Sequence, residues 1–176
     1  EDNFDDFREQ PLIPYRHSRL GPVLSWFDVD GDDDDDLLIA SGAGQPLSVR
    51  INDGEGRFRD GNASVSPSSD KVDLTTIIGI PIDAKRRTVF VAESNLQSSA
   101  AGNSVVREYN FDGSGSAAEM MSMTDGVGPV AVADYDNDGD LDFFLGGRIV
   151  PSRFPEAPNS LLYANSNGNY ALDPEN

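Results

Sequence analysis

An acidic segment occurs twice in this chain, each time between two apolar runs. DVDGDDDDDLL at residues 28–38 recurs 106 residues later as DYDNDGDLDFF at residues 134–144. Each copy follows an apolar run that opens with Gly-Pro, at residues 21–27 and 128–133. Short apolar runs bounded by turn-forming residues indicate β-strands, so we interpret each copy as a strand, an acidic loop and a second strand. A unit repeated at this distance favours a fold built from repeats.

A degraded third copy lies between these two. Half of the 106-residue offset is 53 residues, and at that point TTIIGIPI (75–82) and TVFVAES (88–94) flank the short loop DAKRR. Turn signals with Asn-Gly or Asp-Gly pairs recur in each unit, in segments that begin at Asn52, Asn110 and Asn165. These pairs supply the positive φ angles that tight hairpins need. The period therefore predicts three units.

Each unit contains four predicted strands, which is the size of one β-propeller blade. The predicted strands are 22–27, 37–41, 46–51 and 57–60, then 75–82, 88–93, 104–110 and 117–121, then 129–133, 143–147, 160–165 and 169–172. The expected fold is all-β, with three four-stranded antiparallel blades at residues 21–62, 71–124 and 125–176, after an N-terminal linker or partial strand at residues 1–20. The alternative is a single β-sandwich with two acidic loops that resemble each other by chance. The matched flanking strands argue against it.

The acidic loops carry aspartates at alternate positions, which is the pattern of a cation site. A hard cation such as calcium takes six to eight oxygen ligands at about 2.3–2.6 Å, and a tightly curled loop can aim alternate side chains at one centre. Two carboxylates ~4 Å apart repel by about 4 kcal/mol near a protein surface, so five in one turn need a counter-ion. We predict two calcium sites, formed by Asp28, Asp30, Asp32, Asp34, Asp36, Asp134, Asp136, Asp138, Asp140 and Asp142.

The register of the first loop follows from its ninth position. A loop that began at Asp30 would place Leu38 where a ligand is needed, whereas a start at Asp28 places Asp36 there.

An EF-hand would need an acid at position 12, which is Ile39 in the first copy and Leu145 in the second. Magnesium is disfavoured because it prefers an octahedral shell with several waters. A solvated charge run would explain one such loop better than two. The seventh position of such loops usually contributes its backbone carbonyl.

The three units differ in the details of their loops. The second acidic loop has Gly139 at its sixth position, where we expect a positive φ, and the first has Asp33 there. We therefore expect the more regular geometry at residues 134–142. The middle unit keeps Asp83 but continues with Lys85, Arg86 and Arg87. We expect these cations to pair with a neighbouring acidic loop.

The composition excludes several classes of partner and site. Asp and Glu outnumber Lys and Arg by 31 to 13, which gives a net charge of −18. Such a chain repels nucleic acid and anionic membranes, so we expect neither as a partner. The chain has no cysteine, which excludes disulfides and zinc–thiolate sites. We expect its single histidine, His17, to be a surface or capping residue. No segment approaches the roughly 18 apolar residues of a membrane-spanning helix, so no membrane insertion is expected.

The acidic loops resemble the FG-GAP or VCBS repeats of integrin-α-like β-propellers. Their strongest motif is D-x-D-x-D-G-x-x-D-[LF], which DYDNDGDLDFF matches in full and DVDGDDDDDLL departs from at the sixth position. Residues 14–33 and 146–165 further resemble cartilage acidic protein-like chains, which carry such repeats beside a UnbV/ASPIC-type domain. The resemblance covers roughly residues 11–172. It implies a calcium-stabilised propeller that serves adhesion or ligand binding in an extracellular, cell-surface or periplasmic location.

Such propellers usually close with more blades than three, within a general range of four to eight. An open stack of three blades would expose two apolar sheet faces, which is an association hazard. The chain also begins EDNFDDF, without methionine. We therefore expect a fragment of a larger propeller, and we expect the isolated piece to self-associate.

For function, we expect a non-catalytic module that binds another protein or a carbohydrate. The candidate contact region is the loop at residues 148–160, where Arg148 and Arg153 lie near Phe154 in the sequence. The alternative is the propeller portion of a secreted carbohydrate-active enzyme, a lyase or hydrolase. No catalytic residues are predicted, because the acids outside the calcium loops, such as Glu93, Glu108 and Glu156, lie in no recognisable catalytic context. A purely structural spacer cannot be told from a binding module by sequence.

Overall fold

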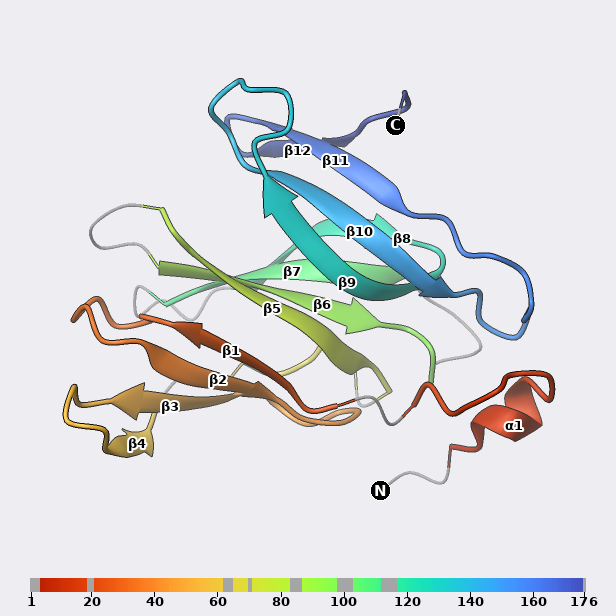
Figure 1. Ribbon diagram of the computed structural model, residues 1–176, viewed down its shortest axis with the longest axis horizontal. Helices are drawn as coiled ribbons and strands as arrows, with labels where there is room; N and C mark the ends of the chain where they lie inside the picture. Colours follow the sequence, from red (N-terminus) through yellow and green to blue (C-terminus); the bar gives the residue numbers. More distant parts are fainter. Residues whose placement is uncertain are drawn as a thin grey trace.

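The computed structural model confirms the predicted all-β fold. Twelve strands in its described part form three antiparallel sheets of four strands each (Figure 1). Strands that are consecutive within a sheet along the chain are hydrogen-bonded neighbours. The structure describes residues 4–18, 21–61, 65–69, 71–82, 87–97, 103–111 and 117–175. No helix in this part of the chain is long and apolar enough to cross a membrane.

The three sheets follow one another along the chain. The first contains β1 (Val23–Phe27), β2 (Asp36–Ala40), β3 (Ser48–Asn52) and β4 (Phe58–Asp60). The second contains β5 (Asp73–Pro81), β6 (Arg87–Ser94), β7 (Ser104–Asn110) and β8 (Ala117–Met123). The third contains β9 (Gly126–Ala133), β10 (Asp142–Ile149), β11 (Leu161–Ser166) and β12 (Asn169–Leu172). Every predicted strand is present, with ends that differ by a few residues.

The start of β9 differs from the prediction for a physical reason. The sequence predicts a start at residue 129, whereas β9 begins at Gly126 and runs through Pro129. The pairing of β9 with β10 shifts register on either side of Gly147. Proline has no backbone N–H to donate and is tolerated in strands at such irregularities. The strand therefore continues through a residue that would end a regular one.

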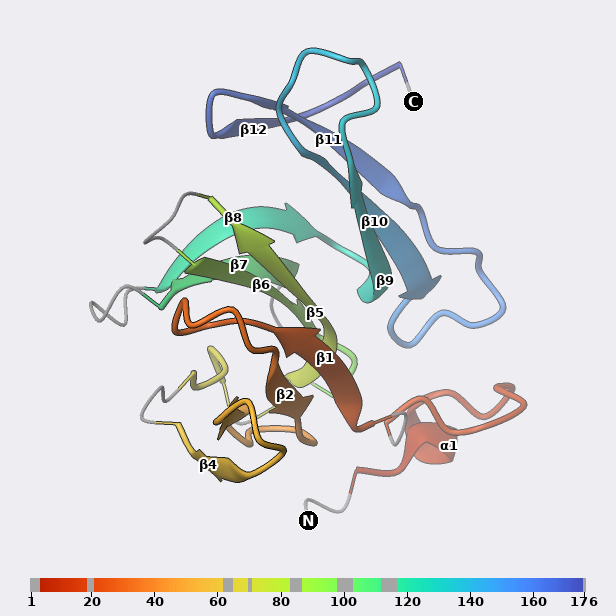
Figure 2. The ribbon, with the colours of Figure 1, turned by 60° about the vertical axis from the view of Figure 1, so that its left-hand side comes forward.

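The sheets pack face to face and share two hydrophobic cores. The first strands, β1, β5 and β9, lie side by side, and the sheets spread outward from them (Figure 2). One core lies between the first and second sheets and includes Leu38 and Val89, while another lies between the second and third and includes Phe90 and Phe143. A Cβ on Gly79 would overlap the ring of Phe27, so this glycine lets β1 approach β5 closely. In the part of the chain that the structure describes, the three sheets do not close into a ring.

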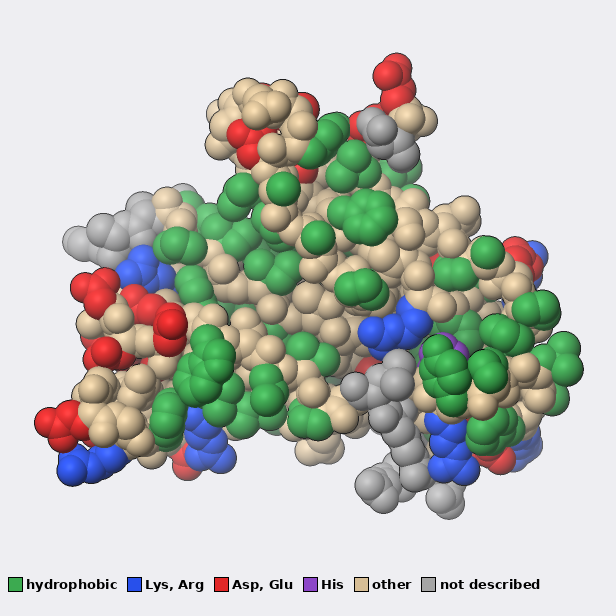
Figure 3. All heavy atoms as spheres, in the orientation of Figure 1, with side chains coloured by type: hydrophobic (Ala, Val, Ile, Leu, Met, Phe, Trp, Pro, Cys, Tyr) green, Lys and Arg blue, Asp and Glu red, His purple; other side chains and the backbone are tan. Residues whose placement is uncertain are grey.

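The outer faces of the stack are partly apolar. In β1, Val23 and Phe27 pack against the first core, whereas Leu24 and Trp26 between them are exposed. Figure 3 shows hydrophobic side chains at the surface in the region of this sheet. The Trp26 ring lies 6.0 Å from that of Phe58 on β4, which is also exposed. On the third sheet, exposed apolar side chains include Phe144 and Leu172. Strand alternation alone explains this pattern, because successive side chains point to opposite faces.

Residues 4–18 fold back onto the sheets. They contain the one-turn helix α1 (Asp6–Glu9). The buried carboxylate of Asp6 accepts hydrogen bonds from the backbone N–H groups of His17 and Ser18 and from the Ser18 hydroxyl. Burial works against ionisation, but these hydrogen bonds hold the pKa of Asp6 below its usual value. Of the two roles expected for His17, the surface position is wrong, because this segment folds back and leaves the side chain 9% exposed.

Two neighbouring phenylalanines provide a matched test of the packing. Phe143 is fully buried against Phe90, at 4.8 Å between ring centroids, whereas Phe144 is 46% exposed on the opposite face. We expect Phe143→Ala to lower the free energy of unfolding by about 3–5 kcal/mol, since it leaves a cavity in the core. Phe144→Ala should change it by less than about 1 kcal/mol. Urea unfolding followed by fluorescence measures both, and equal losses would contradict the assigned faces.

Candidate metal centres

The ninth aspartate of the first loop is buried and holds the loop to the sheet. Asp36 is fully buried, and its two oxygens accept backbone hydrogen bonds from Val29 (2.9 Å) and Asn52 (2.8 Å). Val29 lies at the start of the loop and Asn52 at the end of β3. The Asn52 side chain donates to the carbonyl of Asp35 at 3.2 Å and accepts from the backbone of Gly54 at 3.2 Å. One carboxylate and one amide therefore connect loop, strand and turn.

The second loop repeats this arrangement contact for contact. Asp142 is buried, and its oxygens accept backbone hydrogen bonds from Tyr135 (3.0 Å) and Asn165 (2.8 Å). The Asn165 side chain donates to the Leu141 carbonyl at 3.1 Å and accepts from Gly168 at 2.8 Å. The sequence marks Asn165 as the start of a turn but does not reveal its role in holding the loop. The recurrence of asparagine at the same place in two units is the signal that could have found it.

The first aspartate of each loop curls the loop around itself. Asp28 accepts backbone hydrogen bonds from Gly31 at 2.6 Å and from Asp33 at 3.3 Å. Asp134 accepts one from Gly139 at 3.1 Å, which corresponds to the bond from Asp33 in the first loop. These hydrogen bonds from backbone N–H groups hold the loop in a tight curl around its first carboxylate. Its other acidic side chains can then converge on one centre.

Each loop has two residues with positive φ. At the sixth position Asp33 has φ +71° and Gly139 has φ +96°, as the sequence predicts for that position. At the fourth position Gly31 has φ +84° and Asn137 has φ +61°, which the sequence analysis does not anticipate. Asparagine and aspartate tolerate this region better than most residues. The first loop therefore has its glycine at the fourth position and the second loop has its glycine at the sixth. Both loops follow the same backbone course.

Each loop gathers three carboxylates that could hold a metal ion. In each cluster, one carboxylate oxygen from every member lies within 4.8 Å of the others. The first cluster contains Asp28, Asp30 and Asp36, and the second contains Asp134, Asp136 and Asp138. Six of the ten predicted ligands are thus brought together.

The other predicted ligands make contacts within or beside the loops. Asp32 accepts a hydrogen bond from the backbone of Asp34 at 3.0 Å. The carboxylate of Asp34 lies against Gly54, where a Cβ would overlap it, and Asp140 accepts from the backbone of Asn167 at 2.7 Å. Both seventh-position side chains therefore lie against the turn that follows the third strand. Asp142, the tenth predicted ligand, makes the buried contacts described above.

A basic residue of the second sheet enters the first cluster. The Arg87 guanidinium lies 3.0 Å from the Asp28 carboxylate, and the two side chains are 14% and 15% exposed. Arg59 lies 3.5 Å from Asp30 at a more exposed position. The predicted pairing of the basic middle loop with a neighbouring acidic loop is confirmed for Arg87. The other residues of that prediction, Asp83, Lys85 and Arg86, lie outside the described residues.

The two clusters differ in their electrostatics. Desolvation and the charges of Asp32, Asp36 and Asp28 raise the pKa of Asp30, although the charge of Arg59 opposes this. Desolvation and neighbouring aspartates also raise the pKa of Asp136. Within the described residues, no arginine or lysine forms an ion pair with the second cluster. Carboxylates that raise one another's pKa are stabilised by a shared cation.

The three side chains noted in the candidate contact loop at residues 148–160 have different surroundings. Arg148 lies on β10 and lines a cavity. Arg153 is exposed and pairs with Glu156 at 2.7 Å, while Phe154 packs against the small core that contains Ile149. The contact role of this loop therefore stays a prediction.

Glu93, one of the acids outside the loops, has a structural position. It is fully buried and accepts hydrogen bonds from Ser68 and from the Tyr109 hydroxyl, the latter at 3.3 Å. Burial and the charge of Glu93 raise the pKa of Tyr109 to about 12. These bonds connect residues 65–69 to the second sheet.

Comparison with known proteins identifies no relative. No family model matches the chain, and no curated protein matches it significantly. The resemblance to FG-GAP or VCBS repeats therefore remains a prediction. The chemistry of the site must be argued from the two loops.

The buried aspartate of the second loop can be tested against an exposed one. The two oxygens of Asp142 each accept a hydrogen bond from a backbone N–H group, whereas an asparagine side chain has only one acceptor oxygen. One buried N–H donor would then lack an acceptor, which costs about 1–3 kcal/mol. We expect Asp142→Asn to lower the free energy of unfolding of chelator-treated protein by that amount. Asp136→Asn should have little effect, because its side chain is exposed and keeps an acceptor oxygen. Urea unfolding measures both, and equal effects would contradict the anchoring role of Asp142.

Proposed function

We propose that this chain is a calcium-binding β-propeller module of the FG-GAP or VCBS type, which binds a protein or carbohydrate and is not catalytic. The observation that carries the proposal is the pair of matching loops between the first two strands of two sheets. Each loop gathers three carboxylates and is held by a buried aspartate through equivalent hydrogen bonds. A charge run that served solubility alone would need neither the convergence nor the anchor.

The ligand chemistry favours calcium. Both clusters consist of carboxylates, and hard oxygen ligands suit calcium and magnesium rather than zinc or copper. Oxygens at about 2.4 Å from a calcium ion are at most about 4.8 Å apart. The oxygens of each cluster lie within 4.8 Å of one another, which is close enough for one calcium ion to contact all three. Calcium also accepts irregular geometry more readily than magnesium does. This suits two clusters that use the first, third and ninth positions in one loop and the first, third and fifth in the other.

The sheet packing supports the propeller. Face-to-face sheets with their first strands side by side are how propeller blades surround a central axis. The exposed Leu24, Trp26 and Phe144 on the outer faces would be covered by further sheets of the same kind. We propose that these belong to a longer chain or to a second copy, and that the three sheets alone self-associate.

The location follows from the affinity that such loops can reach. Extracellular calcium modules bind with dissociation constants of roughly 10⁻⁴–10⁻³ M, which suits compartments that are rich in calcium. We therefore propose an extracellular, cell-surface or periplasmic location. The net charge of −18 supports a partner other than nucleic acid.

Calcium titration tests the function directly. We expect chelator-stripped protein to bind two calcium ions in isothermal calorimetry. At a free calcium concentration 100 times the dissociation constant, each site should stabilise the fold by about 2.7 kcal/mol. This stabilisation appears as a higher melting temperature. Asp28→Asn and Asp134→Asn should each remove one ion. Glu119→Gln, which removes an exposed acid on β8, should remove none.

The result that would contradict the proposal is a melting temperature that calcium does not change. Equal stabilisation by magnesium at the same concentration would contradict the choice of metal. Loss of both ions in the Glu119→Gln control would show that binding follows net charge rather than the loops.

The two sites should differ in affinity because of Arg87. Its charge lies against Asp28 and competes with a bound cation, whereas the second cluster has no such contact among the described residues. We expect Arg87→Gln to tighten calcium binding at the first site by about tenfold, or ~1.4 kcal/mol. Arg57→Gln, which removes an exposed charge that pairs with Glu55, should change it little. Calorimetry in the Asp134→Asn background isolates the first site, and weaker binding in Arg87→Gln would mean that Arg87 positions Asp28 as a ligand.

A further inference from the structure

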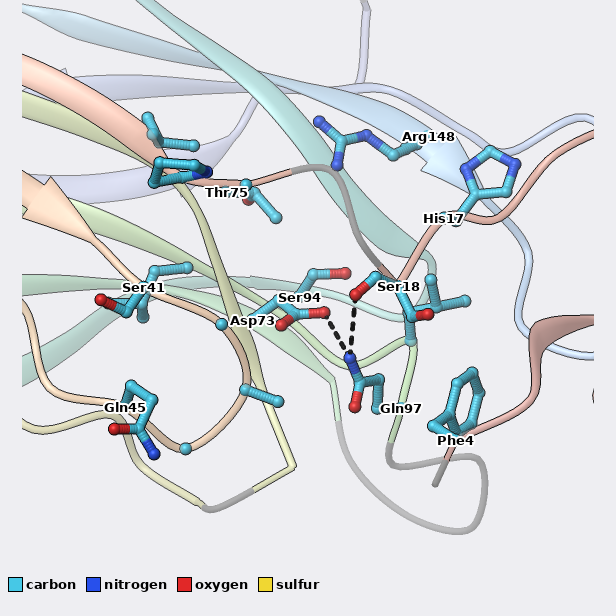
Figure 4. A pocket seen from close by; sticks show the side chains of 18 residues that line it. Phe4, His17, Ser18, Ser41, Gln45, Asp73, Thr75, Ser94, Gln97 and Arg148 are labelled. Carbon is cyan, nitrogen blue, oxygen red and sulfur yellow. Dashed lines mark hydrogen bonds between the residues drawn. The ribbon is translucent and has the colours of Figure 1, made fainter. Parts of the chain in front are cut away.

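A cavity of about 880 Å³ lies away from the acidic loops, near the opposite ends of β1 and β5 (Figure 4). The loops follow the last residues of β1 and β9, whereas the cavity is lined by the first residues of β1 and β5 and by Arg148 near the end of β10. His17 and Ser18 from the N-terminal segment complete one side. Neither the loops nor their metals account for this cavity.

Arg148 is a half-buried cation that lacks a direct partner in the described residues. It makes no hydrogen bond and no ion pair within that part of the chain, and Asp73 acts on it only through its charge. Burial lowers the pKa of Arg148, yet an arginine stays protonated at neutral pH. Five guanidinium donors at a cavity wall are suited to a carboxylate, which they can bind through two parallel hydrogen bonds. In a chain with a net charge of −18, such a cation marks a place where an anion is accepted.

His17 also lacks a hydrogen-bond partner on one atom. Its side chain is 9% exposed, and its buried Nδ1 has no partner within the described residues. Burial and the charge of Arg148 lower the pKa of His17, although the charge of Asp6 opposes them. A neutral imidazole can donate or accept one hydrogen bond at each nitrogen. Because its Nδ1 is closed off from solvent, His17 shapes the wall beside Arg148, and Arg148 is the group suited to a ligand.

The rest of the cavity wall carries groups that suit hydroxyls. The Gln97 amide donates to the Asp73 carboxylate at 2.9 Å and to the Ser18 carbonyl at 3.4 Å, and Figure 4 shows Ser94 beside this pair. The Asp73 carboxylate therefore has a fixed orientation and retains acceptor capacity. Hydroxyl and amide side chains at the wall include Ser41, Gln45, Thr75 and Ser94. Hydrogen-bond donors and acceptors around a single cation suit a sugar ring that carries several hydroxyls and one negative charge.

We propose that this cavity binds an acidic sugar, whose carboxylate pairs with Arg148 and whose hydroxyls bond to Asp73 and the neighbouring polar side chains. The volume lies within the roughly 300–1,000 Å³ of typical ligand pockets and exceeds what a simple anion fills. An acidic sugar would be the ligand in the binding role proposed above. This inference rests on that role but not on the calcium loops. Asp73 is the one carboxylate of the described wall, whereas glycoside hydrolysis typically uses two, which favours binding over cleavage.

Titrations with matched ligands test this site. We expect glucuronate and galacturonate to bind the calcium-loaded protein in NMR titrations. Glucose, which lacks the carboxylate, and acetate, which lacks the ring, should bind at least tenfold more weakly. The amide signals of Gly42, Gly44 and Gln97 at the cavity should shift, while those of Gly139 and Gly168 near the second loop should not. Signal mapping on the unaltered protein keeps the test valid even if a variant fails to fold.

A pair of arginine variants completes the experiment. Arg148→Gln should weaken uronate binding at least tenfold, whereas Arg57→Gln, at an exposed arginine paired with Glu55, should leave it unchanged. Three results would each overturn the proposal. They are acetate binding as tight as uronate binding, signal shifts at the loops instead of the cavity, and an absence of uronate binding. Calcium binding is measured on the same samples. If calcium binds and uronates do not, the sugar site alone is wrong, and if uronates bind without calcium binding, the metal assignment alone is wrong.

Discussion

The rest of the structure depends on a buried carboxylate at the end of each acidic loop. Asp36 and Asp142 each accept backbone hydrogen bonds from the start of the loop and from the third strand of their sheet. A buried carboxylate with unmet acceptors would be strongly destabilising, so this arrangement defines where the loop begins and ends. The strands on either side keep their register because the loop cannot slide past its anchor. Three carboxylates of each loop are then gathered at one point, and in the first loop Asp36 itself is one of them.

Electrostatics distinguishes the acidic loops from the cavity. The loops of β1–β2 and β9–β10 concentrate negative charge, and Arg87 compensates part of it in the first cluster. Arg148 and His17 line a cavity that holds one carboxylate among its described residues. The first acidic loop follows the last residue of β1, whereas the first residue of β1 lines the cavity. A calcium ion at that loop and an anion at the cavity would therefore occupy separate places.

The packing of the sheets follows from strand alternation. Phe143 fills the core between two sheets while its neighbour Phe144 is exposed on the outer face. The same alternation in β1 buries Val23 and Phe27 and exposes Leu24 and Trp26. A sheet with apolar side chains on both faces is suited to the interior of a stack. The outer two sheets share this property, which is the physical reason to expect further sheets or copies against them.

The sequence by itself determined the local features: the twelve strands, their grouping into three sheets, and the converging acids of the two loops. These depend on alternation and on the spacing of neighbouring residues, which a sequence displays directly. The tertiary structure decided how distant segments meet. Asp6 folds the N-terminal segment back, and His17 comes to line the same cavity as Arg148. The sequence predicts that the basic middle loop pairs with an acidic loop, and the packing selects Asp28 as the partner of Arg87. No periodicity encodes such contacts, because they depend on the angle between packed sheets and on which buried polar groups must find partners.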